Sequence, residues 1–139
     1  MNAPLYTTQI LRLAASLPEP VELERIDGAA SERSPTCGSL VETSVQLADG
    51  RVEALSQKVQ ACAFGQASAA IVATHATGRS AEEVREALGQ LASWLAGERE
   101  DPPEWPGFDV LAPARGRRSR HGAILLPLRA LSAALYKAA

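Results

Sequence analysis

Cysteine, histidine and aromatic residues are scarce in this chain of 139 residues. It contains two cysteines, two histidines and only 4% aromatic residues. So few cysteines, with no secretory signal beside them, argue against a disulfide framework. We expect free thiols, metal ligands or redox-active groups in a reducing, cytoplasmic setting. The first twenty residues lack a basic start followed by an unbroken apolar run, so we expect no signal peptide.

Long apolar runs and a strong net charge are also missing. The longest apolar stretches are far too short to span a bilayer, and the formal net charge is −2. We therefore expect no insertion into a membrane and no global field that attracts nucleic acid. Glycine-rich phosphate loops, paired catalytic carboxylates and nucleophile–base signatures are absent, and we expect a protein that is not an enzyme.

The composition is that of an ordinary soluble domain, with 46% hydrophobic and 22% charged residues. The length suffices for one domain with a core, and we expect a single domain over residues 1–139. Apolar residues at helical spacing predict a helix that ends before Pro18. Alternation over residues 21–25 then predicts a modest strand, and the stretch "GAASERSPTCG" has the composition of a loop.

A β-hairpin is the clearest feature of the middle of the chain. Residues 41–47 alternate between apolar and polar, and Asp49-Gly50 suits a two-residue turn because both positions tolerate positive φ. The return strand covers residues 52–61, with a bulge expected near Ala54 and Leu55.

Helices follow the hairpin. The alanine-rich stretch after Cys62 predicts a tightly packed helix, and Ser80 with Glu83 predicts a capping box that opens the next one. A proline-rich linker leads to a terminal helix from about His121, with Pro127 near its first turn or at a kink. The order predicts an α+β fold: an N-terminal helix, a three-stranded antiparallel meander sheet, then helices packed on one face.

Both cysteines lie at ends of the predicted hairpin. Cys37 is in the loop that enters the first arm, and Cys62 ends the second arm where a helix begins. Because antiparallel arms of similar length start and finish at one edge, this topology brings the thiols near each other. A helix N-terminus also favours the thiolate of Cys62. From spacing alone, two core-filling thiols are as good an interpretation as a functional pair.

The stretch "CGSLVETSVQLADGRVEALSQKVQACAFGQASAAIVATHATGRSAEEV" resembles the iron–sulfur cluster assembly scaffold family, of the IscU type that also forms the N-terminal domain of NifU. The shared pattern is Cys-Gly, a hairpin, a second cysteine, a small-residue helix containing Ala-Ser, and a capped helix. It covers roughly residues 36 to 96 and implies a SufE/NifU-like fold.

The resemblance implies a function and a set of ligands. Family members assemble a [2Fe–2S] cluster on three cysteines with help from an aspartate, receive sulfur from a cysteine desulfurase and pass the cluster to acceptor proteins; some relatives bind zinc. Cys37 and Cys62 match the first two cysteines. Ser39 stands in place of the aspartate, and Ala123 stands in place of the third cysteine.

The ligand set is thus incomplete, and several ways of completing it remain open. His121, two positions before Ala123, is a candidate nitrogen ligand; the alternative is a surface histidine. An exogenous thiol, a partner protein or a homodimer with two facing cysteine pairs would also supply ligands. The family's Leu-Pro-Pro-Val-Lys chaperone-docking motif is absent, and the arginines of "RGRRSR" stand there as a possible dock for an acidic partner or as a solvated loop.

Three functions are therefore in view. The first is a scaffold-like protein that binds iron, an iron–sulfur cluster or zinc through Cys37 and Cys62. The second is a degenerate homologue that acts as an adaptor or regulator without a cluster. The third is a sulfur acceptor, in which one thiolate takes persulfide sulfur from the desulfurase.

Overall fold

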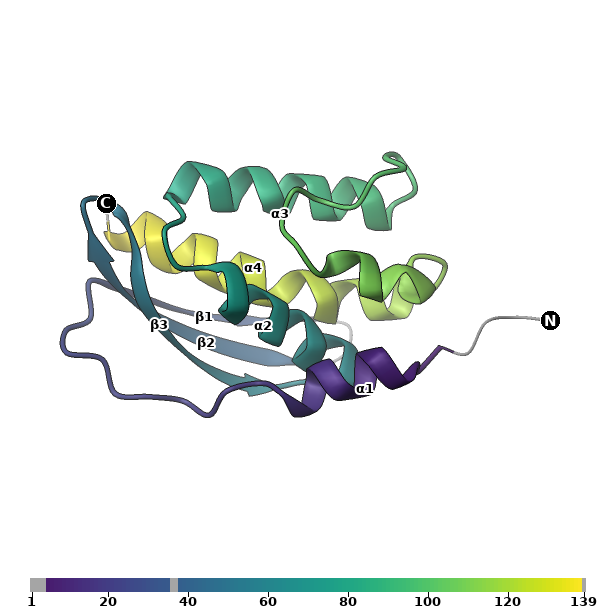
Figure 1. The fold of residues 1–139 in the computed structure, drawn as a ribbon, viewed down its shortest axis with the longest axis horizontal. Helices are drawn as coiled ribbons and strands as arrows, with labels where there is room; N and C mark the ends of the chain where they lie inside the picture. Colours follow the sequence, from purple (N-terminus) through teal and green to yellow (C-terminus); the bar gives the residue numbers. More distant parts are fainter. Residues whose placement is uncertain (1–4, 36–37, 139) are drawn as a thin grey trace.

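The computed structural model describes residues 5–35 and 38–138, and it places the helices on one face of a three-stranded antiparallel sheet (Figure 1). The strands lie in the order β1-β2-β3. The elements in chain order are α1 (Thr8–Ala15), β1 (Gly28–Arg33), β2 (Leu40–Ala48), β3 (Arg51–Gln60), α2 (Ala63–His75), α3 (Ala81–Leu95), the 3₁₀ helix η1 (Phe108–Ala114) and α4 (Arg118–Ala138). The predicted α+β fold class is confirmed.

The β2–β3 hairpin forms as the sequence predicts. Asp49 and Gly50 both have positive φ, 52° and 75°, which is the geometry of a tight two-residue turn. The register changes once along the hairpin: Gln46 pairs with Ala54, and the next residue pairs with Val52. Glu53 is therefore the extra residue of a bulge, adjacent to the position predicted.

The first strand lies elsewhere than the alternation of residues 21–25 predicts. β1 is formed by "GAASER", which has the composition of a loop, and it pairs with β2 from Gly28 with Val45 to Arg33 with Leu40. Residues 21–25 run along the other face of the sheet, where the backbone N–H of Val21 donates to Ser56 Oγ. Val21 is 57% exposed, so the apolar side chains of this alternating stretch do not pack into the core.

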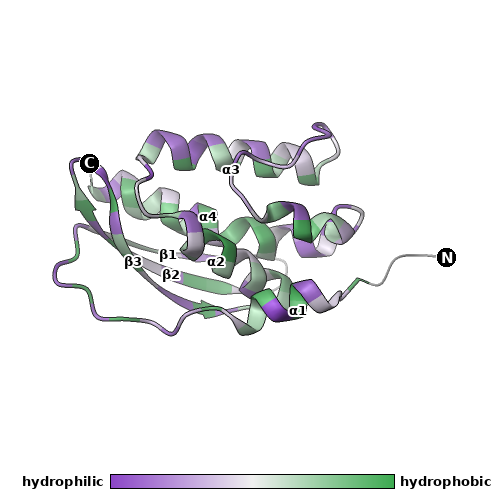
Figure 2. Ribbon diagram, viewed as in Figure 1, coloured by the Kyte–Doolittle hydropathy of each residue, from purple (hydrophilic) through white to green (hydrophobic). Residues whose placement is uncertain are grey.

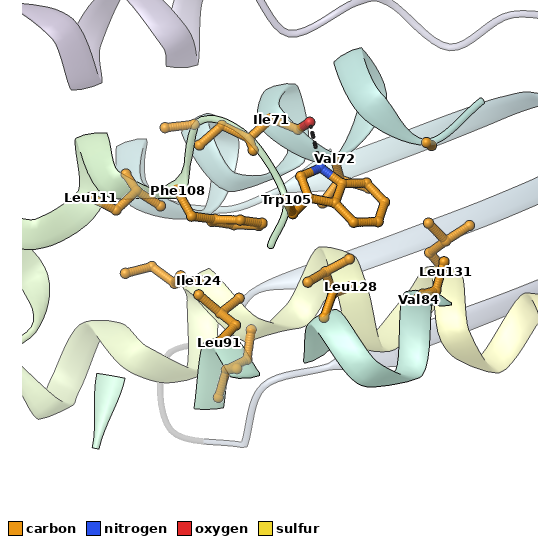
Figure 3. Packing of buried hydrophobic residues seen from close by; sticks show 14 of the residues in the cluster. Ile71, Val72, Val84, Leu91, Trp105, Phe108, Leu111, Ile124, Leu128 and Leu131 are labelled. Atoms are coloured by element: carbon orange, nitrogen blue, oxygen red, sulfur yellow. Dashed lines mark hydrogen bonds between the residues drawn. The ribbon is translucent and has the colours of Figure 1, made fainter. Parts of the chain in front are cut away.

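The core lies between the sheet and the helices and is closed by the linker before η1. Trp105 is 1% exposed and donates its indole N–H to the carbonyl of Ile71 in α2 at 3.1 Å (Figure 3). The guanidinium of Arg79 lies 4.5 Å from the Trp105 ring centroid. These contacts hold the proline-rich linker against α2.

Helix α3 begins with the predicted capping box. Ser80 Oγ accepts a hydrogen bond from the backbone N–H of Glu83 at 3.2 Å, and the Glu83 carboxylate accepts one from the N–H of Ser80 at 3.2 Å. The helix buries Val84, Leu91 and Leu95 and leaves its opposite face polar (Figure 2). It therefore forms the outer layer of the fold.

Helix α4 begins at Arg118, three residues before the predicted start, and runs beneath α3 along the sheet (Figure 1). Pro127 is buried inside it. Because proline has no N–H, the carbonyl of Ala123 lacks its usual helical donor. Among the helices of residues 5–35 and 38–138, none is long and apolar enough to cross a membrane.

Candidate functional site

The two segments that carry the cysteines meet at one end of the sheet. The last rung of β1–β2 pairs Arg33 with Leu40, and the last rung of β2–β3 pairs Leu40 with Gln60. Cys62 follows that rung by two residues. Since paired antiparallel residues are about 5 Å apart at their Cα atoms, the β1–β2 turn and the β3–α2 junction share this rim.

Cys37 itself lies outside the described residues, but Ser34 before it and Gly38 and Ser39 after it are described. The backbone N–H of Ser34 donates to the carbonyl of Ser39 at 2.9 Å, and the N–H of Gly38 donates to the carbonyl of Ser34 at 3.2 Å. Gly38 has a φ of +71°, which a residue with a side chain rarely adopts. The turn is thus closed across its base. The separation of the two sulfur atoms remains a prediction.

Cys62 is the N-cap residue of α2. It is half-buried, with extended backbone angles of φ −67° and ψ 174°, and its side chain makes no capping hydrogen bond. The carbonyl of Cys62 accepts the N–H of Gln66 at 2.9 Å, which starts the helix. The thiol is therefore left free for other chemistry beside the first N–H groups of α2, which lack helical partners.

Ala123 lies against the beginning of α2, as the resemblance implies for the third ligand position. A Cβ added to Gly65 would be 3.5 Å from the Cβ of Ala123 and 2.6 Å from the Cβ of Ala61. The overlap is with Ala61, just before α2, whereas 3.5 Å to Ala123 is ordinary van der Waals contact and shows that α4 lies directly against α2 here. Ala123 is 1% exposed, and its methyl group lies beside Gly65, which is three residues after Cys62, at the position where the resemblance implies a thiol.

Ser39 is buried as well, with 4% of its surface exposed. Its backbone carbonyl closes the turn that follows β1. A hydroxyl is a weaker ligand for iron or zinc than a carboxylate. Neither position where the sequence departs from the family pattern therefore offers a strong ligand.

His121 faces a different part of the molecule. Its Nε2 lies 3.1 Å from the carbonyl oxygen of Ala114 and 2.9 Å from that of Arg115. Carbonyl oxygens only accept, so Nε2 carries the proton and donates. Helical geometry also turns residue 121 by about 200° from residue 123, which contacts α2. Ligation by His121 stays a prediction, and in this arrangement Nδ1 is the ring nitrogen left for it.

The site offers cysteine thiols but not a complete set of metal ligands. Within residues 5–35 and 38–138, no three His, Cys, Asp or Glu side chains are grouped so that they could hold a metal ion. A tetrahedral iron or zinc centre takes four ligands, and thiolates are the ones that iron–sulfur clusters use. Cys62 and the turn that carries Cys37 can therefore supply half of such a set.

Sequence reasoning missed the contact that holds α2 to α4 beside this rim. Ser68 is fully buried, and its hydroxyl donates to the carbonyl of Ile124 at 2.6 Å. This hydrogen bond holds α2 and α4 together next to the contact between Gly65 and Ala123. The signal was the run of small residues after Cys62, which indicates close packing without showing its partner.

Comparison with known proteins gives relatives by structure. No family model matches the sequence. No curated protein matches it either. A NifU-like N-terminal protein from Brucella abortus has a TM-score of 0.84 and 29% identity, covering 96% of this chain and 93% of that one.

Two further solved structures share the fold. One, from the thermophile Fervidobacterium islandicum, is described as a proposed iron–sulfur cluster assembly scaffold for the SUF system, with a TM-score of 0.78, 19% identity, and coverage of 94% of this chain and 96% of that one. The other is a hypothetical protein with a TM-score of 0.69 and 21% identity, covering 92% and 96%.

The likeness extends over nearly the whole chain and includes the order of helices and strands. The resemblance seen in the hairpin and the two cysteine motifs is therefore confirmed in the fold, which this chain shares with the NifU-like protein and the proposed SUF-system scaffold.

Proposed function

We propose that the protein is a scaffold-like carrier in iron–sulfur cluster assembly, which holds iron or a [2Fe–2S] cluster as cargo through Cys37 and Cys62. The observation that supports this most is the shared rim: the turn after β1 and the N-terminus of α2 are brought together by the hairpin register. Zinc is a further candidate for the same thiolates.

The missing ligands come from outside the chain in this proposal. Ser39 and Ala123 leave two thiolates, and the described residues offer no third group beside them. Two small-molecule thiols or the cysteine pair of a second copy would complete four ligands. The protein then acts as a binder and donor of cargo rather than as a catalyst, with a cysteine desulfurase as its sulfur source and iron–sulfur acceptor proteins as recipients.

Anaerobic reconstitution tests this proposal. The protein is incubated with iron, sulfide and a small thiol, desalted, and analysed for bound iron, bound sulfide and visible charge-transfer absorbance. We expect all three signals in the wild type and their loss in Cys37→Ser and in Cys62→Ser. Retention of bound iron and absorbance in both serine variants would contradict the proposal.

The two histidines supply a matched control for the ligand set. His121→Gln removes the candidate nitrogen ligand, whereas His75→Gln changes the other histidine of the chain at the end of α2. If His121 is a ligand, His121→Gln alone weakens retention of the metal. Equal retention in the two variants would remove His121 from the ligand set. Size-exclusion chromatography of the loaded protein separates the second-copy arrangement from the small-thiol arrangement.

The sulfur-acceptor function is a second candidate, because the structure leaves a half-buried cysteine at a helix N-terminus with its thiol uncommitted. A persulfide acceptor needs one reactive thiolate and no full cage. Incubation with a cysteine desulfurase and cysteine, followed by intact mass spectrometry, tests it. Added sulfur on Cys37 or Cys62 without reconstitution of a cluster would favour the acceptor, and its absence would remove this candidate. Desulfurase binding that survives in the Cys37→Ser/Cys62→Ser variant without either chemistry would favour an adaptor.

A further inference from the structure

The four arginines of the "RGRRSR" segment divide into one structural residue and three free ones. Arg115 donates from Nε to the carbonyl of Trp94 and from Nη2 to the carbonyl of Arg99, both at 2.9 Å. Its guanidinium also lies 5.1 Å from the Trp94 ring centroid. Arg115 thus joins the last turn of α3 to the segment that follows it, and its side chain is committed to the fold.

The other three arginines have no such task. Arg117 and Arg118 are exposed and Arg120 is half-buried. In the part of the chain that the structure describes, their side chains make no hydrogen bond and no ion pair. Arg118 and Arg120 belong to the first turn of α4, and no acidic residue shares that turn.

This placement is unfavourable for the helix itself. The N-terminus of a helix carries partial positive charge, so acidic residues stabilise a first turn and basic residues destabilise it. Three unpaired arginines at this end therefore add nothing to the stability of the free protein. An anionic partner would relieve both the mutual repulsion and the unfavourable interaction with the helix dipole.

A hollow beside the arginines gives such a partner a place to bind. It has a volume of about 450 Å³ and is lined by Leu95, Ala96, Arg115, Gly116, Arg118 and His121. No lining residue is acidic, and two are arginines. The lining combines the apolar side chains of Leu95 and Ala96 with the cationic Arg115 and Arg118, which suits a peptide that presents carboxylates together with an apolar side chain.

We propose that this arginine surface, formed by Arg117, Arg118 and Arg120 with the adjoining hollow, docks an acidic segment of a partner protein. Arginine forms paired hydrogen bonds with carboxylates, which gives geometric specificity as well as attraction. The surface lies where α4 begins, beside the end of α3. The proposal does not depend on metal or sulfur chemistry.

A protein segment fits better than nucleic acid does. Three residues of helix advance only about 4.5 Å, so the arginines form a compact group rather than a track along a phosphate backbone. Specific DNA binders typically neutralise several phosphates along an extended surface. The whole chain also has a formal net charge of −2, which opposes binding of a long polyanion.

Fluorescence anisotropy with a short polyglutamate peptide tests the proposal, with a polyglutamine peptide of equal length and a single-stranded DNA oligonucleotide as comparisons. The variant Arg117→Gln/Arg118→Gln/Arg120→Gln is matched by Arg12→Gln/Arg85→Gln/Arg129→Gln, which removes three exposed arginines elsewhere. We expect the first variant to bind polyglutamate about tenfold more weakly at low salt, and the second to stay close to wild type.

The stability of the variant is part of the test. Removing cations from the N-terminus of α4 leaves the melting temperature unchanged or raises it if the arginines serve docking. A lower melting temperature would show that they serve the fold and would overturn the proposal. Equal weakening in both triple variants, polyglutamate binding no tighter than polyglutamine binding, or tighter binding of DNA through the same arginines would each overturn it as well.

Discussion

At Gly28 the backbone of β1 lies directly against α4. An added Cβ would overlap the carbonyl oxygen of Ala134 and would be 2.8 Å from the Cβ of Ala138. The obstruction is partly backbone, so it could be relieved only by moving the strand or the helix. Glycine is therefore required at position 28 by the close packing of β1 against α4, and not for the flexibility of its backbone.

We predict that Gly28→Ala lowers the free energy of unfolding by about 2 to 3 kcal/mol, which is the usual cost of forcing extra volume into a packed core. Urea unfolding followed by circular dichroism measures it. Gly89 provides the control: it is exposed in α3, and a Cβ there would meet nothing within 4 Å. Gly89→Ala should raise stability by about 0.5 to 1 kcal/mol. Similar effects of the two substitutions would contradict this account of Gly28.

The same residue explains why β1 could not be predicted. "GAASER" contains the small and polar residues that mark loops, and single-sequence reasoning has no means to see α4 above them. Gly28 and Ala30 are buried because a helix passes close overhead. In residues 21–25, by contrast, alternation was present but no layer covers Val21. In both stretches, tertiary contacts decide the secondary structure: a helix covers the small residues of β1, and nothing covers the alternating residues 21–25.

At the scale of elements, the beginning of α3 depends on charge. The backbone N–H of Ser80 and then the Arg51 guanidinium, whose Nη1 donates to Glu83 Oε1 at 2.5 Å, lower the pKa of Glu83 from its usual value of 4.5. Arg51 also donates to the carbonyl of Gly78 at 2.9 Å. The ionised carboxylate thus joins the hairpin to the capping box.

This coupling predicts a dependence of stability on pH. Because folding lowers the pKa of Glu83, its contribution is present above pH 4.5 and is lost as the pH falls through the lower folded value. Wild type should therefore melt at a higher temperature than Glu83→Gln at neutral pH, and the difference should shrink at acidic pH. Glu86→Gln, an exposed change on the same helix, is the control. A difference that persists unchanged into acid would refute the role of ionisation.

Elements with strong local signals were predicted well. The Asp49-Gly50 turn and the Ser80 and Glu83 capping box are local interactions, and both form as expected. The candidate site was predictable in its topology, since hairpin ends meet at one edge of a sheet. The orientation of His121 was not, because it depends on carbonyl oxygens of Ala114 and Arg115, which carry no sequence signature.

At the scale of the whole molecule, the rim is shared by two cysteine-bearing segments and by α4. Restoring the family's third thiol should therefore strengthen cargo binding. We predict that Ala123→Cys retains iron and sulfide longer than wild type when a chelator is added, because a third thiolate would come from α4 beside Gly65. Loss of visible absorbance with time measures this.

A second buried alanine of α4 serves as the control for that experiment. Ala134 is fully buried and lies against Gly28, at the end of β1 opposite the Arg33–Leu40 rung. Ala134→Cys adds a thiol of the same kind without adding one to the rim, so it should release cargo at the wild-type rate. Equal gains in retention for the two cysteine variants would mean that the position of Ala123 is irrelevant.

The proline inside α4 has a consequence for amide hydrogen exchange. Pro127 has no amide hydrogen, so the first turns of α4 lack one of the bonds that would tie them to the remainder of the helix. Residues 118–122 are exposed or half-buried, so this first part of α4 can open while the buried residues between Ala123 and Leu135 remain protected in the core. Deuterium should thus enter the N-terminal part of α4 first. Binding of iron or a cluster at the rim, or of an acidic peptide at the arginine surface, should slow the exchange there.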